Sequence, residues 1–132
     1  MNSNINEVKK LENEMSQIND DALKAKMMAV QSLDDSDNAI HRQWSAMSSD
    51  EKIESVRTLI VNDAKKTDIE RSYISDIVDS GAHREVVAKL NIIAQQMSAE
   101  ASNMVTVADI MNRVATIINY AVQVAELFGK LA

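Results

Sequence analysis

Residues 104–128 of the sequence read MVTVADIMNRVATIINYAVQVAELF, and they carry its clearest structural signal. The polar side chains recur mostly every three or four residues, as they do along one stripe of an α-helix, and the other positions are apolar. A surface helix normally has an apolar arc a little wider than 100°. Because the arc here covers about two-thirds of the circumference, we predict a long C-terminal helix that is largely buried.

The composition of the 132-residue chain favours helices throughout. It has no proline and two glycines, whereas sheets depend on turns rich in Gly, Pro and Asn-Gly pairs. Aromatic residues, which favour strands, make up 3% of the chain. We therefore predict an all-α protein with a single helical domain over residues 1–132. The expected architecture is an antiparallel helical bundle or elongated helical hairpin of three to five helices.

Apolar residues in the first part of the chain alternate at steps of three and four, which predicts a helix over residues 4–33 with a helix–helix seam. Polar residues 34–38 then read DDSDN, and such short side chains favour turns and caps over helix interiors. A break is therefore expected there, followed by a short helix over 38–47. The seam positions are Val8, Leu11, Met15, Ile18, Ala22, Ala25 and Ala29.

A capping box of Ser48 and Glu51 predicts the start of a helix over 49–79. A second capping box, Thr67 with Glu70, leaves open a kink or restart near residue 66. Gly81 is expected to end this helix in the left-handed conformation. The inner face is predicted from the apolar spacing of Ile53, Val56, Ile60 and Ala64.

From residue 82 to 128 there is neither Gly nor Pro, and the apolar stripe loses its phase once, in the polar stretch 98–103. Either one helix of about 47 residues, ~70 Å long, carries a local phase change, or two helices meet there. The absence of a strong breaker favours the single helix. The expected stripe is Val86, Leu90, Ile93, Met97, Ala101, Met104, Ala108, Met111, Ala115, Ile118, Val122 and Ala125.

The charge distribution argues against nucleic acid as a partner. The net charge is −6, and residues 1–81 hold 16 acids and 10 bases while residues 82–132 hold four of each. A nucleic-acid-binding protein needs a basic stripe, and an anionic membrane surface also attracts basic residues. We therefore predict no nucleic-acid partner.

No residue pattern indicates a catalytic, cofactor or metal site. His41 and His83 stand outside every His-x-x-x-His or Glu-x-x-His spacing, there is no cysteine, and two separated glycines cannot form a phosphate-binding loop. Acidic pairs such as Asp20-Asp21 and Asp34-Asp35 lie in polar runs, not at inner positions. We predict no enzyme activity, no metal and no cofactor.

The expected localisation is cytoplasmic, because the N-terminal residues lack the basic and apolar regions of a signal peptide. Leaderless secretion is the alternative. The longest charge-free run near the end, residues 114–125, is far shorter than the ~20 residues of a membrane span.

These observations predict a protein that acts by helix packing against a protein partner or a second copy of itself. The setting that fits is bacterial: a secretion-associated component, a chaperone or inhibitor, or a subunit of a helical assembly. The alternative is a membrane-active, pore-forming toxin-like protein that exposes its C-terminal helix to lipid. The candidate interaction residues are Val8, Leu11, Met15, Ile18, Trp44, Met104, Met111, Ile118, Val122 and Phe128.

Overall fold

The computed structural model describes residues 2–72 and 80–131, and over the first sixteen residues it describes the side chains of Asn6 and Lys9 only. Within this part of the chain there are four α-helices and no strand, which confirms the all-α prediction. A short 3₁₀ helix links the first two. The elements are α1 (Asn2–Gln43), the 3₁₀ helix (Trp44–Ala46), α2 (Ser49–Glu70), α3 (Gly81–Ser102) and α4 (Val107–Gly129).

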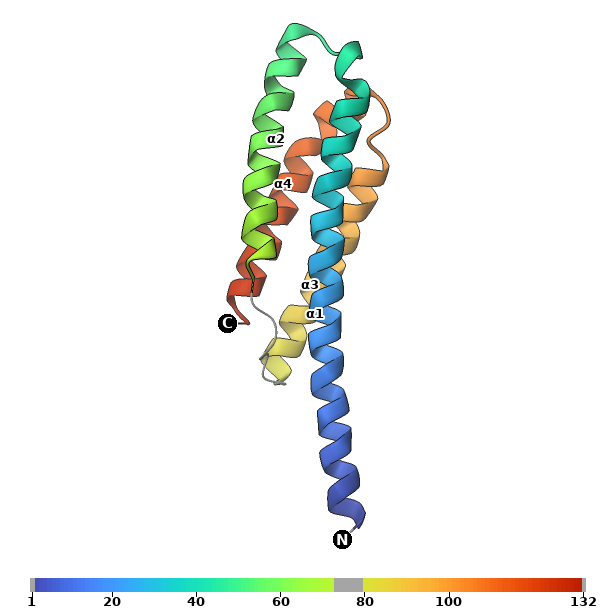
Figure 1. Cartoon of the computed structure of the whole chain (residues 1–132), viewed down its shortest axis with the longest axis vertical. Coiled ribbons are helices and arrows are strands. Elements are labelled where there is room, and N and C mark those ends of the chain that lie inside the picture. The colour runs from blue at the N-terminus through green and yellow to red at the C-terminus, as the bar shows by residue number, and fades with distance from the viewer. Residues whose placement is uncertain (1, 73–79, 132) are drawn as a thin grey trace.

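The four helices form an elongated bundle in which successive helices run in opposite directions (Figure 1). The most extensive interface joins α1 to α3, and these two neighbours run in the same direction. At this interface the side-chain amide of Asn91 donates to the backbone carbonyl of Asp21 at 3.3 Å. Around the bundle the order is therefore α1, α3, α4, α2. The N-terminal part of α1 projects beyond the other helices (Figure 1).

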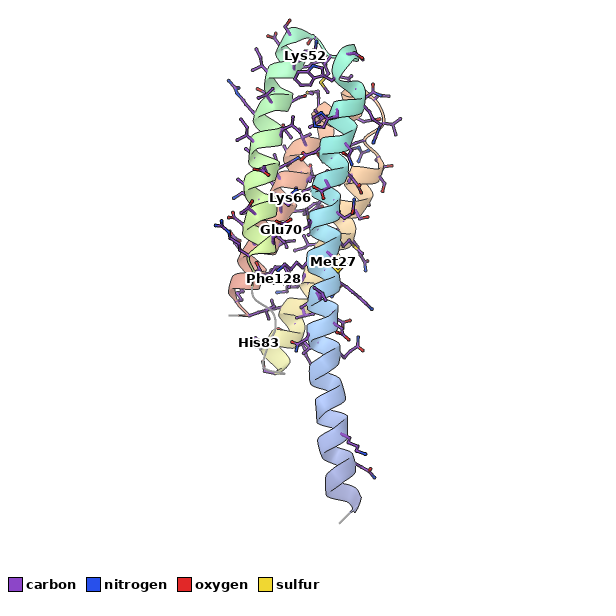
Figure 2. The ribbon with its side chains drawn as sticks, viewed as in Figure 1. Met27, Lys52, Lys66, Glu70, His83 and Phe128 are labelled. Atoms are coloured by element: carbon purple, nitrogen blue, oxygen red, sulfur yellow. The ribbon has the colours of Figure 1, made fainter. Side chains whose placement is uncertain are left out.

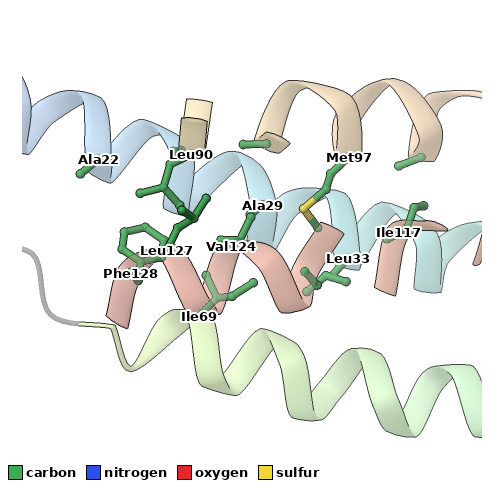
Figure 3. Packing of buried hydrophobic residues seen from close by; sticks show 14 of the residues in the cluster. Ala22, Ala29, Leu33, Ile69, Leu90, Met97, Ile117, Val124, Leu127 and Phe128 are labelled. Atoms are coloured by element: carbon green, nitrogen blue, oxygen red, sulfur yellow. The ribbon is translucent and has the colours of Figure 1, made fainter. Parts of the chain in front are cut away.

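Small side chains let α1 and α3 pack closely along this interface. Ala22, Ala25 and Ala29 of α1 are fully buried, which confirms that part of the predicted seam. Leu90 and Met97 of α3 are also fully buried in the same cluster, as Figure 3 shows. Large residues on one helix thus fill the space that alanines leave on the other, as close packing requires.

The predicted break at residues 34–38 is wrong, because α1 continues through it. The polar side chains that we expected to stop the helix interact with α2 instead. Asp34 accepts a hydrogen bond from Lys66 at 3.1 Å, Asp37 accepts one from Asn62 at 2.8 Å, and Ser36 is fully buried. Since these groups are engaged by α2, they do not compete with the helical backbone of α1.

The start of α2 follows the prediction. Ser48 Oγ accepts from the backbone N–H of Glu51 at 3.2 Å, and Glu51 Oε1 accepts from the backbone N–H of Ser48 at 2.8 Å. This is the reciprocal capping box that the spacing predicts. At the other end, Thr67 does not cap a new helix, because its hydroxyl donates to the Asp63 carbonyl at 3.0 Å and α2 continues to Glu70.

The chain between α2 and α3 differs from the prediction at Gly81. This glycine is the first residue of α3 and has no positive φ, so the expected left-handed C-cap is wrong. The preceding Ser80 caps α3 instead, with its hydroxyl accepting from the backbone N–H of His83 at 3.1 Å. The end of the predicted helix 49–79, from residue 73 to 79, lies outside the described residues.

The single helix favoured for residues 82–128 is also wrong, and the alternative of two helices is right. A capping box starts α4: Thr106 Oγ1 accepts from the backbone N–H of Asp109 at 3.1 Å, and Asp109 Oδ2 accepts from that of Thr106 at 3.0 Å. The hydrogen bond that the Thr106 backbone N–H donates to the Asp109 carboxylate lowers the pKa of Asp109, and those from the Thr106 hydroxyl and the Val105 N–H act in the same direction. Across the turn, Arg113 pairs with Glu100 at 2.8 Å, which joins α4 to the end of α3.

The predicted extensive burial of the C-terminal helix is not confirmed. Six of the 23 residues of α4 are buried, and Ala108 and Ala115, both expected on the inner stripe, are exposed. The buried stripe lies one residue earlier in phase, at Ile110 and Ile117, where Met111 and Ile118 were predicted. A helix that is apolar around most of its girth offers several stripes of the same spacing, so periodicity alone does not choose among them.

Candidate interaction surface on the second helix

α2 has a stripe of apolar residues on its outward face and buries mainly polar residues, the reverse of the prediction. Ile53, Val56 and Ile60, expected on the inner face, are 53%, 44% and 66% exposed, and Ala64 is exposed as well. We call Ile53, Val56 and Ile60 the α2 stripe. The residues that α2 buries are Ser55, Thr58, Asn62 and Ile69.

A polar layer between α1 and α2 explains this orientation. Asn62 is 1% exposed, and its amide donates to Asp37 Oδ1 at 2.8 Å and to Ser36 Oγ at 3.4 Å. Nearer the start of α2, the buried hydroxyl of Ser55 donates to the sulfur of Met47 at 3.1 Å. No donor in the described part of the chain reaches Asn62 Oδ1, although this atom is buried. The layer therefore adds specific hydrogen bonds to the apolar contacts that Ile69 of α2 makes in the core.

Asp37 is the titratable group of this layer. Desolvation by burial raises the pKa of Asp37 above its ordinary value of 3.8, and the nearby carboxylate of Asp34 acts in the same direction. The hydrogen bond from Asn62 and the positive charges of Lys66 and His41 oppose the increase without cancelling it. The folded protein thus carries a carboxylate where a neutral group would cost less to bury.

We expect Asp37→Asn to stabilise the fold increasingly as the pH rises. Because the folded pKa is raised, protonated Asp37 favours folding below 3.8, and this contribution is lost as the pH increases through the folded pKa. The asparagine variant has no such loss. Denaturant unfolding measures the free energy of unfolding of both proteins at about pH 4 and about pH 7. The difference in favour of the variant should be larger at the higher pH. The control is Asp20→Asn, at an exposed position of α1. If the stability of Asp37→Asn relative to the wild type fell as the pH rose, the raised pKa of Asp37 would be contradicted.

Negative charge surrounds the α2 stripe. The exposed residues of α2 include five carboxylates and one arginine, Arg57, which pairs with Glu54 at 3.0 Å. Asp50 lies one turn before Ile53, and Asp63 lies one turn after Ile60, so a carboxylate stands at each end of the stripe. The lysines of α2 are less exposed: Lys52 lies 5.7 Å from the centre of the Trp44 ring, and Lys66 reaches Asp34. Figure 2 shows these two lysines toward opposite ends of α2.

A second exposed apolar patch lies on α1. Leu23 and Met27 are exposed one turn apart, and they line a shallow hollow with Lys26, Val30 and Glu70. Figure 2 labels Met27 on α1 and Glu70 on α2. The ammonium group of Lys26 is not free there, because it donates to the backbone carbonyl of Ser72 at 2.8 Å. Through Lys26 this patch adjoins Ser72, the last residue described before segment 73–79, so we assign it no role.

The seven predicted interaction residues whose side chains the structure describes do not gather on one surface. Ile18, Met104 and Phe128 are buried in the core, and Trp44 and Met111 are partly buried against it. Three of the ten predicted residues lie in the projecting part of α1, where the backbone is helical but their side chains are not among those described. Those three are Val8, Leu11 and Met15, and the remaining two, Ile118 and Val122, are partly buried on α4.

The α2 stripe was visible in the sequence as an apolar stripe but was placed on the wrong side of the helix. A signal for the correct side exists in the neighbouring residues. Ser55, Thr58 and Asn62 form a stripe of small polar residues with helical spacing, and Ser32 and Ser36 form a matching one on α1. Two matched polar stripes can pack together with their hydrogen bonds satisfied, which frees the apolar stripe to face outward.

The described residues contain no group of three or more His, Cys, Asp or Glu side chains arranged to hold a metal ion. None of the helices they form has both the length and the apolar character that crossing a membrane would require. Comparison of the whole chain with protein-family models, with curated protein sequences and with solved structures finds no match.

Proposed function

We propose that this protein is a non-enzymatic binding protein that holds a partner protein by helix packing on the outward face of α2. The observation that carries the proposal is the orientation of α2. Two isoleucines and a valine spaced along one face of a helix form the kind of surface that another helix covers. Contiguous apolar surface of this kind marks interaction sites on soluble domains more often than scattered single residues do.

The exposed area of the α2 stripe sets how much free energy a covering helix would gain from it. Burying an Ile or Val side chain completely stabilises a protein by about 1.5–3 kcal/mol. Since the three side chains are roughly half exposed, a covering helix would recover about 3 kcal/mol from them. Association itself costs at least ~4 kcal/mol, so the stripe alone gives weak binding. A natural partner would also contact the charged residues that flank the stripe.

A titration followed by nuclear magnetic resonance tests the proposal. The probe is a helix-stabilised peptide of about 21 residues, ~30 Å long, with apolar residues at helical spacing and neutral Gln flanks. Added to the ¹⁵N-labelled full chain, it should shift amide signals along residues 50–68. The double variant Ile53→Ser/Ile60→Ser should lose these shifts. Ile92→Ser should retain them, because Ile92 is an isoleucine of similar exposure, 57%, on α3.

Circular dichroism of each variant shows whether the bundle remains folded. The proposal fails if millimolar probe leaves the α2 signals unchanged in the wild type. It also fails if Ile92→Ser abolishes the shifts as fully as the α2 double variant does. Shifts along α2 that appear with lipid vesicles and not with the peptide would instead favour the membrane-active alternative.

A further inference from the structure

We infer that the partner of the α2 stripe is a cationic amphipathic helix of another protein, with Lys or Arg residues at both ends of its own apolar stripe. This inference rests on the proposed function and adds the chemical class of the partner. It is carried by the charges around the stripe, which are independent of the apolar residues themselves.

The charges that face outward on α2 are predominantly negative and bracket the stripe. Asp50 and Asp63 stand one turn beyond its two ends, and within the described residues neither forms an ion pair. Farther along, Asp68 and Glu70 are also exposed. A helix lying along Ile53, Val56 and Ile60 therefore meets a carboxylate at each end, and basic residues there would be the matching charges.

The same charges disfavour two other occupants of the α2 stripe, a second copy of this chain and an anionic membrane. A second copy would bring its own five exposed α2 carboxylates to this surface, in a protein whose net charge is already −6. Like charges placed across an interface oppose association. An anionic membrane surface is disfavoured for the same reason, because it attracts basic and not acidic surfaces.

Two peptide probes test the inference. They share the apolar positions of the neutral probe and carry either Lys or Glu at the flanking positions. We expect the Lys probe to bind the full chain about tenfold more tightly than the Glu probe at low salt, and the ratio should fall toward one at about 0.5 M NaCl as charges are screened. The shifts produced by the Lys probe should lie along residues 50–68.

A charge-neutralised variant provides the matched control. Asp50→Asn/Asp63→Asn should bring the affinity for the Lys probe close to that for the neutral probe. Asp20→Asn/Glu126→Gln removes two exposed carboxylates from α1 and α4 and should leave the preference for Lys over Glu unchanged. Equal loss of preference in both double variants would overturn the inference, because net charge and not the α2 surface would then be responsible.

The outcomes separate this inference from the proposed function. If the neutral, Lys and Glu probes bind equally at α2, the cationic partner is wrong and the proposed function stands. If no probe shifts the α2 signals, both are wrong. Shifts of α2 signals with protein concentration alone would assign the stripe to a second copy, and tight binding of α2 to anionic vesicles would assign it to a membrane, so either result overturns the inference.

Discussion

Replacing Ile69 with alanine is expected to lower the free energy of unfolding by about 2–4 kcal/mol, whereas Ile60→Ala should change it by less than ~0.5 kcal/mol. Both residues are isoleucines of α2. Ile69 is fully buried and points into the core beside α4 (Figure 3), while Ile60 is 66% exposed. Truncating the buried side chain leaves a cavity and loses apolar burial, and truncating the exposed one does neither.

This pair of substitutions tests which way α2 faces. Denaturant unfolding followed by circular dichroism measures both variants against the wild type. If α2 faced the core with Ile53, Val56 and Ile60, Ile60→Ala would be the more damaging change. That order of effects would remove the basis of the interaction surface, and equal small effects would mean that α2 is not packed on the bundle.

Replacing Asn62 with alanine is expected to lower the free energy of unfolding by about 1–2 kcal/mol. The substitution removes the amide that donates to Asp37 at 2.8 Å and to Ser36 at 3.4 Å, and it leaves the carboxylate of Asp37 without that partner. It also removes the buried carbonyl oxygen of Asn62, which limits the loss. Asn112→Ala, at an exposed position of α4, should have a smaller effect.

A double-mutant cycle isolates the contact between α1 and α2. Asn62→Ala and Asp37→Ala together should cost about 1 kcal/mol less than the sum of the two single variants. Additive effects would show that the hydrogen bond does not stabilise the native state. An Asn62→Ala variant more stable than the wild type would show that the unpaired carbonyl costs more than the amide hydrogen bonds contribute.

The fold class was predictable because it depends on properties summed along the chain. Scarce glycine, absent proline and abundant helix formers leave helices as the stable backbone arrangement. The alanine seam of α1 was also predictable, since Ala22, Ala25 and Ala29 are the positions that continue a clear alternation of three and four.

Helix boundaries were harder to predict because the deciding contacts join residues far apart in sequence. Asp37 remains inside α1 because Asn62 binds it, and nothing near residue 37 indicates that partner. The start of α4 is different, since its capping box is local. Thr106 and Asp109 have the required spacing, but the acid is Asp where Glu or Gln is usual at that position.

The sequence predicted which residues form the α2 stripe, but not that the stripe faces away from the core. Ile53, Val56 and Ile60 form an apolar stripe in the sequence, and the general expectation is that such a stripe faces the core. Here Ser55, Thr58 and Asn62 take that side, because α1 offers Ser36 and Asp37 as partners. Which stripe is buried depends on the neighbouring helix, and single-helix periodicity contains no information about it.

The pairing of α1 with α3 has a consequence for how the chain folds. The hydrogen bond between Asp21 and Asn91 spans 70 positions in sequence, so the most extensive interface forms only after a long loop closes. In a bundle whose largest interface joins consecutive helices a short loop closes, whereas the α1–α3 interface here requires a longer loop to close, which slows folding. α2 takes no part in that interface and packs against α1 and α4, so the pairing of α1 with α3 requires closure of a loop that contains the whole of α2.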